Sequence, residues 1–320
     1  MRGLSALSGL FGLSGLFGFS GLFGFSGFFG SMWRPMWHRR RGVVELKWLS
    51  ARTYTMKWYP QGVDFGTWQG RRTLAVSWFR KEKSGAHLAS RVTFIDLERS
   101  RHLDVALTIE TEDGELVPAQ IHAGGLAWFG DRLFVAATGQ GIWEFDLGES
   151  RRLRGAAARR VVGARGRGLG AVALAAVRTR VHPVPLRCSF LGRVFDDEGT
   201  SVPRVLIGEY RGDKLGRIGE FTIPGDADGS FIAVDQNVPQ IARMQGAVQW
   251  GDRRFISQSR GMQPGALWDG DGAAPQRSDV PLPIGCEDLA LDPEGRMLWT
   301  LGEHPWRRVV RGIPFDQLGL

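Results

Sequence analysis

The chain has 320 residues, of which 43% are hydrophobic and 23% are charged, and this composition suits one large globular domain rather than a disordered or fibrous protein. Its 45 glycines and 12 tryptophans favour many short strands joined by tight turns. The net charge of +8 is concentrated in residues 34–41 and 151–180 while the repeats described below are roughly balanced, so we expect solvated basic loops and no nucleic-acid partner.

The first 41 residues form an apolar tail with a basic end. Residues 7–30 repeat a six-residue unit, LSGLFG or a close variant, and no charge occurs between Gly3 and Trp33. This exceeds the roughly 18 residues that nominate a membrane span, but its many glycines weaken a helix. Three interpretations stay open: a membrane anchor or degenerate export signal with membrane contact through residues 3–33, a disordered tail, or an extension translated from repetitive DNA.

Residues 42–320 contain one strand–turn–strand pattern five times, in residues 61–97, 124–147, 189–223, 246–268 and 287–315. Gly-Asp-Arg or Asp-Pro-Glu-Gly forms the first turn in three copies, and the strand after it is nearly all apolar, as in LFVAAT and MLWTLG. A strand that is apolar on both faces must be covered on both faces. Repeated antiparallel sheets stacked around an axis meet this need, so the sequence predicts an all-β, β-propeller fold with five recognised blades.

Two parts of the propeller are less regular. The last copy supplies three strands before the chain ends, so we expect Val43–Trp48 or Thr53–Trp58 to add the outer strand and close the ring. Residues 148–186 are rich in Arg, Gly and Ala, and they predict a long loop or insertion with partial helix. A sixth blade in this segment is the alternative. The two cysteines, Cys188 and Cys286, lack metal-ligand spacing, and we expect buried thiols, although one bridge is open to them.

Seven short motifs occur in order along the chain: WYPQG (58–62), HAGG (122–125), FDL (145–147), GEY (208–210), MQGA (244–247), EDL (287–289) and LWTLGE (298–303). This series resembles a group of uncharacterised, secreted β-propeller-like proteins of actinobacteria, over residues 58–315. The resemblance implies export or residence in the cell envelope, and it carries no established activity. The chain departs from that group in residues 151–185 and in lacking a clean export signal.

Propellers converge the starts of their inner strands on a central channel, and the repeat alignment picks out which side chains lie there. Gln61, His122, Gln245 and Glu287 occupy this position, with a fifth supplied by Arg187 or Ser189. Amide, imidazole and carboxyl groups can all bind ligands, but the glutamines are equally able to join neighbouring blades. Glu287 followed by Asp288 is a speculative Ca²⁺ site, unless Asp288 instead caps backbone amides at a blade interface.

The ends of the second strands predict a rim around this ring. Its members are Trp78, Thr138, Glu209, Tyr210, Arg260, Glu303 and His304. Aromatic walls with a few convergent polar groups are the usual composition of a small-ligand site. Glu303 and His304 can form an acid–base pair, although His-Pro-Trp after a turn is also an ordinary loop.

No motif commits the chain to a reaction, because it has no phosphate-binding Gly-Lys-Ser/Thr loop, no His-Glu-x-x-His and no Gly-x-Ser-x-Gly. We therefore expect a binding module, monomeric, that holds a small molecule, glycan or peptide at its central face. One alternative is a metal-dependent, Ca-type hydrolase resembling the lactonase-like propellers, with the ion on Glu287. The other is a structural or adhesive envelope protein.

Overall fold

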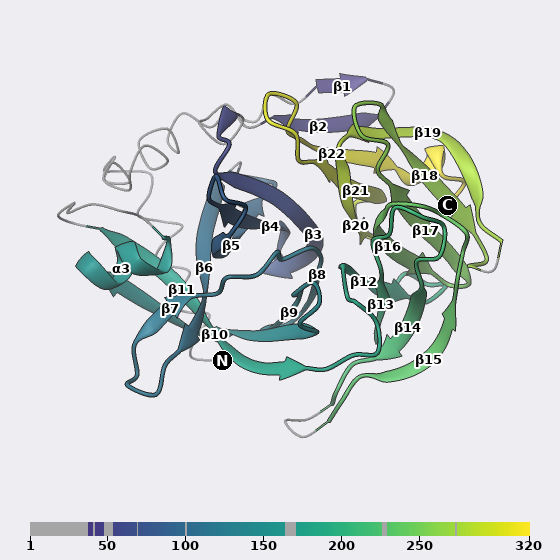
Figure 1. Cartoon of the computed structure of the whole chain (residues 1–320). Coiled ribbons are helices and arrows are strands. Elements are labelled where there is room, and N and C mark those ends of the chain that lie inside the picture. The colour runs from purple at the N-terminus through teal and green to yellow at the C-terminus, as the bar shows by residue number, and fades with distance from the viewer. Residues whose placement is uncertain are drawn as a thin grey trace.

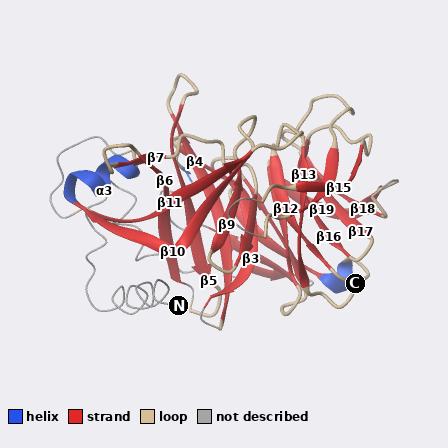
Figure 2. Ribbon diagram, turned by 90° about the horizontal axis from the view of Figure 1, so that it is seen from below, coloured by secondary structure: helices blue, strands red, loops and turns tan. Residues whose placement is uncertain are grey.

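The computed structural model describes residues 38–40, 42–47, 54–68, 70–99, 101–163, 171–225, 229–272 and 274–320. These residues are almost entirely strands, which run between two ends where the loops gather (Figures 1 and 2). The apolar tail of residues 1–37, and with it the anchor prediction, lies outside the described residues. Within them, no helix is both long enough and apolar enough to cross a membrane.

The strands form five antiparallel groups, and each group contains one copy of the sequence repeat. The first is β3 (Trp58–Trp68), β4 (Arg71–Lys81), β5 (His87–Asp96) and β6 (Arg101–Glu110), with the short β7 (Leu116–Pro118) beside β6; the second is β8 (Leu126–Phe129), β9 (Arg132–Ala136), β10 (Ile142–Arg154) and β11 (Val172–His182). The third is β12 (Phe190–Phe195), β13 (Ser201–Gly208), β14 (Ile218–Thr222) and β15 (Ile232–Asn237); the fourth is β16 (Met244–Trp250), β17 (Arg253–Gln258), β18 (Pro264–Gly270) and β19 (Gln276–Ile284). The fifth is β20 (Cys286–Asp292), β21 (Met297–Gly302), β22 (Val309–Pro314), β2 (Val43–Lys47) and β1 (His38–Arg40), and a 3₁₀ turn, η2 (Phe315–Gln317), follows β22.

An N-terminal strand completes the fifth group, as the sequence predicted. β2 pairs antiparallel with β22, from Val44 opposite Gly312 to Lys47 opposite Val309. Of the two segments proposed for closure, residues 43–47 therefore take this place. The two ends of the propeller sequence meet in one sheet, which Figure 1 shows as the purple strands beside the yellow ones.

Buried apolar clusters fill the spaces between consecutive groups and show that the groups form a closed ring. Each cluster joins side chains from two neighbouring groups: Phe94 with Trp128, Phe134 with Phe221, Phe190 with Ile256, Phe255 with Leu298, and Trp299 with Trp78. The last pair returns from the fifth group to the first. This cyclic packing is the β-propeller that the apolar second strands predicted, because each sheet is covered on both faces by its neighbours.

The outer strands of the first two groups also meet, which the sequence did not predict. β11 pairs in parallel with β6, from Leu174 opposite Val105 to Val177 opposite Thr108. The helix α3 (Gly155–Val161) connects β10 to β11 and buries Val161 against them. The expected loop at residues 148–186 is thus corrected: its described residues are mostly the outer strands of the second group, and they form no group of their own.

Glycines bring the inner strands into direct contact at the centre of the ring. A Cβ atom on Gly125 would lie 2.2 Å from the backbone nitrogen of Leu191, and one on Gly246 would lie 2.5 Å from the Cα of Asp288. A Cβ atom on Gly62 would lie 2.9 Å from the backbone of Gly125. No side chain fits between backbones this close, so the expected central channel is closed at this level. Residues immediately before these glycines are left at the mouth of the ring.

Candidate functional site

The loops that precede the inner strands lie at one end of the ring. Because neighbouring strands alternate in direction, the loops between second and third strands lie at the same end. We call this end the central face; its loops are residues 54–57, 82–86, 119–125, 137–141, 183–189, 209–217, 238–243, 259–263, 285 and 303–308.

Two amide–carboxyl contacts connect predicted residues on the central face. The side-chain amide of Gln61 donates to Glu303 Oε2 at 2.9 Å, and that of Gln245 donates to Glu287 Oε1 at 3.2 Å. Gln61 and Glu287 are buried, whereas Gln245 and Glu303 are half-buried. Both bonds run between neighbouring groups of strands, which is the role given above as the alternative for the two glutamines.

Two neighbouring carboxyl groups of the central face, those of Glu287 and Glu303, have raised pKa values. Burial raises the pKa of Glu287 well above its usual range, and repulsion from Glu303 and Asp288 adds to this. Burial also raises the pKa of Glu303, although the charge of His304, 3.9 Å away, and the bond from Gln61 oppose the rise. A protonated carboxyl can donate as well as accept a hydrogen bond, so this floor can bind groups of either kind.

His122 belongs to a group of stacked rings. Its ring centre lies 4.5 Å from that of Phe79 and 5.4 Å from that of His87, while Phe79 also stacks on Tyr59 at 5.5 Å. Burial, together with the charges of His87, Lys81 and Arg187, lowers the pKa of His122 to about 4. The imidazole is therefore neutral at pH 7 and is able to accept a hydrogen bond.

Three polar atoms of this face are buried without a hydrogen-bond partner among the described residues. They are Thr138 Oγ1, Ser189 Oγ and His304 Nε2. Ser189 occupies the fifth ring position, while Arg187, the other candidate for it, is exposed. Buried polar atoms are nearly always paired with protein or water, and the described residues supply no partner for these three.

The remaining rim residues differ in what they can contact. Trp78 is fully buried between the first and fifth groups, so a ligand cannot reach it where the structure places it. Although burial opposes the change, two bonds from the Arg217 guanidinium lower the pKa of Glu209 to about 2, and its carboxylate is fully engaged. Tyr210 is 37% exposed and Arg260 half-buried, and both stay accessible.

Asp288 has the structural role that we gave as the alternative to a calcium ligand. Its Oδ2 accepts hydrogen bonds from the backbone of Val63 at 3.1 Å and of Leu126 at 3.3 Å, and so fastens three inner strands together. The described residues contain no group of three or more His, Cys, Asp or Glu side chains placed to hold a metal ion. Cys188 and Cys286 are buried free thiols.

Exposed apolar side chains gather on the central face, a feature that the sequence alone did not reveal. Ten large hydrophobic residues are exposed in the described chain, and seven lie in its loops: Tyr54, Met56, Tyr210, Leu215, Val238, Met262 and Trp306. Trp306 is 73% exposed, and its ring centre lies 4.4 Å from that of Tyr54.

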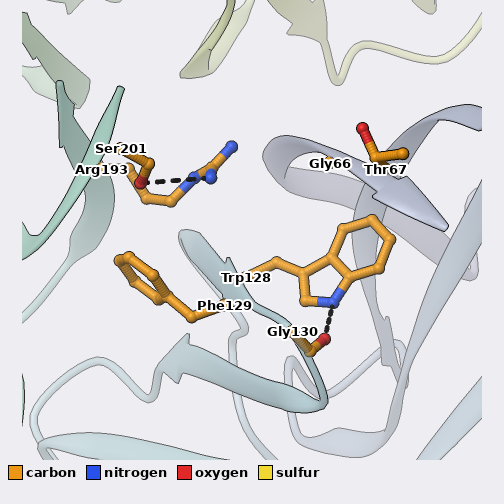
Figure 3. A pocket seen from close by; sticks show the side chains of 7 residues that line it. All are labelled: Gly66, Thr67, Trp128, Phe129, Gly130, Arg193 and Ser201. Atoms are coloured by element: carbon orange, nitrogen blue, oxygen red, sulfur yellow. Dashed lines mark hydrogen bonds between the residues drawn. The ribbon is translucent and has the colours of Figure 1, made fainter. Parts of the chain in front are cut away.

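A pocket opens at the other end of the inner strands, where we predicted nothing. It has a volume of about 290 Å³ and is lined by Gly66, Thr67, Trp128, Phe129, Gly130, Arg193 and Ser201 (Figure 3). Arg193 of this lining forms an ion pair with the buried Asp64. No pattern in the sequence pointed to this pair, because the two residues are 129 positions apart.

No protein-family model matches the chain, and no curated protein matches it. Solved structures similar to it include the GH43_1 enzyme from Xanthomonas citri, at 12% identity over 82% of this chain and 91% of that one, with a TM-score of 0.43. The β-propeller domain of Myceliophteria thermophila Cps50 (Swd1) matches at 11% identity over 81% of this chain and 98% of that one, with a TM-score of 0.38. Because these scores lie below 0.5, neither likeness carries weight for function.

Proposed function

We propose that this propeller is a binding module whose central face holds an acidic peptide segment with apolar side chains. The observation that carries the proposal is the gathering of exposed apolar residues on the loops of that face. Exposed Trp, Tyr and Met side chains are typical of the centres of protein interfaces, whereas a solvated surface seldom concentrates them at one end.

The charge of the same loops favours an acidic partner. They contain ten basic and four acidic residues. Two of the acids are already paired, Glu209 with Arg217 and Asp213 with Arg211. The basic residues are Lys57, Lys83, Arg187, Arg211, Lys214, Arg217, Arg243, Arg260, Arg307 and Arg308. Complementary charge speeds association and selects the partner more than it adds affinity.

The amide and carboxyl side chains of the floor suit the backbone and polar groups of such a segment. Gln61 and Gln245 each carry both a donor and an acceptor on the side-chain amide. Thr138, Ser189 and His304 each offer a buried atom that a ligand can pair. A peptide that reaches these atoms gains hydrogen bonds that water otherwise has to supply.

Binding of the full chain to an array of peptides that vary in net charge and apolar content tests this proposal. We expect acidic peptides with aromatic or aliphatic residues to bind, and we expect Trp306→Ala to weaken them at least about tenfold, as for a central interface residue. Arg307→Glu should slow association, while Arg277→Glu on β19, exposed but away from this face, should not. Binding that is unaffected by Trp306→Ala and Arg307→Glu contradicts the proposal.

A metal-dependent hydrolase is the second candidate, and one observation favours it. Glu303 adds to the raised pKa of Glu287, and two neighbouring carboxyl groups of this kind can act as an acid–base pair. If Glu287 binds Ca²⁺, the purified protein should contain the ion in stoichiometric amount, and Glu287→Gln should remove it. Metal content that is the same in both proteins excludes this site.

A further inference from the structure

The pocket beyond the inner strands is a second site, separate from the central face. Gln61 and Gly66 lie five residues apart on β3, which corresponds to about 16 Å along an extended strand. Gly66 and Thr67 lie near the end of β3, Phe129 ends β8, and Ser201 begins β13. The pocket therefore opens on the end of the ring opposite the central face.

Arg193, which lines the pocket, forms an ion pair with the buried Asp64, which does not line it. The Nε of Arg193 lies 3.0 Å from Asp64 Oδ2, and the two side chains are 9% and 3% exposed. Asp64 also accepts hydrogen bonds from the backbone of Phe65 and Trp128, both at 2.7 Å, and Arg193 donates to the carbonyl of Phe65. These contacts tie β3, β8 and β12 together beneath the cavity.

The N–H groups on the side of the Arg193 guanidinium that faces Ser201 can donate further hydrogen bonds. Arg193 Nη1 reaches Ser201 Oγ at 3.4 Å, a long bond for an N–H donor. The hydroxyl of Ser201 and that of the exposed Thr67 lie on either side of the opening. Figure 3 shows Arg193 and Ser201 on one side, Gly66 and Thr67 on the other, and Trp128 and Phe129 below them in that view.

The walls are two aromatic side chains that neighbouring groups hold in place. Trp128 donates its indole N–H to the carbonyl of Gly130 at 2.6 Å, and it packs so closely on Gly66 that a Cβ atom there would lie 2.7 Å from its ring. Phe129 packs edge-on against Phe134 at 6.2 Å. Trp128 and Phe129 are consecutive residues of β8, and both line the pocket.

From this geometry we infer that the pocket binds a single sugar residue. An uncharged ligand suits a neutral ion pair, since it adds no unpaired charge beside it. The volume of about 290 Å³ is at the small end of ligand pockets. A sugar ring offers apolar C–H faces to the two aromatic rings, and its hydroxyl groups both donate to and accept from Ser201, Thr67 and Arg193.

Titration calorimetry of the full chain with the methyl glycosides of glucose, galactose and mannose tests this inference. We expect at least one of them to bind. Thr67→Trp should fill the opening and weaken binding by at least about tenfold, whereas Thr179→Trp, at an exposed threonine on β11, should leave it unchanged. Ser201→Ala, a smaller change, should weaken binding severalfold even if Thr67→Trp disturbs the fold.

The outcomes separate the two sites. Absence of binding by all three glycosides, or binding that survives both Thr67→Trp and Ser201→Ala, overturns the inference. Binding of adenosine or uridine that Thr67→Trp blocks, without sugar binding, shows a nucleoside pocket instead. Peptide binding at the central face should be the same in wild type and Thr67→Trp, so failure of one proposal leaves the other standing.

Discussion

Replacing Glu287 with glutamine tests whether the floor of the central face is uncharged at neutral pH. Glu287 is buried at the start of β20, where burial and the neighbouring Glu303 and Asp288 carboxyls raise its pKa well above the usual range. Glutamine has nearly the same shape, and its amide can keep the contact with Gln245 without a charge. We therefore expect the folded protein to accept the substitution and, as the pH rises, to be stabilised by it.

The direction of this pH effect on the free energy of unfolding follows from proton binding. Between the usual glutamate pKa, about 4.3, and its raised value in the protein, the folded state keeps a proton that the unfolded chain loses. The free energy of unfolding therefore falls as the pH rises, by up to about 1.4 kcal/mol per pH unit for one such group. Glu287→Gln removes this pH-dependent fall in the free energy of unfolding. From pH 5 to pH 7 the variant should gain up to about 3 kcal/mol relative to the wild type.

Urea unfolding of both proteins at pH 5, 6 and 7 measures the difference directly. Glu98→Gln, at an exposed glutamate in the turn after β5, is the control for loss of a carboxylate elsewhere. Its difference from the wild type is the baseline against which the change for Glu287→Gln is judged. If Glu287→Gln is less stable than the wild type at pH 7, or its advantage does not grow with pH, then Glu287 is ionised in the folded protein and the reasoning fails.

Three further substitutions test the ring by chemical denaturation. Leu46→Ala, in the closing strand β2, should lower the free energy of unfolding by about 2–5 kcal/mol, and an unchanged midpoint would contradict closure by this strand. Gly125→Ala should destabilise by at least about 1–3 kcal/mol, because the added carbon meets Leu191; Gly212→Ala, with open space around it, is its control. Ser77→Ala should cost about 1–3 kcal/mol, because its buried hydroxyl joins the backbone of Gly62 in β3 to that of Ala123 in the loop before β8, both at 2.7 Å; a neutral result would show that water replaces it.

The sequence predicted the parts of the fold that repeat. A strand that is apolar on both faces allows few arrangements, and five copies of it led to the stacked sheets and to the need for a closing strand. Repeat equivalence also picked out Gln61, Gln245 and Glu287, which the structure places at one end of the ring. It could not predict which residues partner them, because the Gln61–Glu303 bond joins positions 242 apart.

The sequence did not predict the features that depend on contacts between different repeats. The β6–β11 pairing joins the outer strands of two groups, and no pattern within either strand requires it. The sequence did not reveal the positive charge of the central face for a similar reason. Its basic residues are spread over loops from Lys57 to Arg308, so they form no run in the sequence, whereas the arginine-rich residues 151–180 drew attention to strands at the edge of the ring.

The glycines at the centre explain both the place and the shape of the candidate site. In Gln61-Gly62 and Gln245-Gly246, the glycine lets two inner strands meet, and the glutamine before it stands at the edge of that contact. Closing the ring at the glycine level leaves polar side chains on a floor at the mouth rather than inside a deep channel. A ligand on such a floor has to spread sideways over the surrounding loops. Those loops carry Trp306, Tyr54 and the other exposed apolar residues, and this is why an extended peptide suits the face better than a small molecule does.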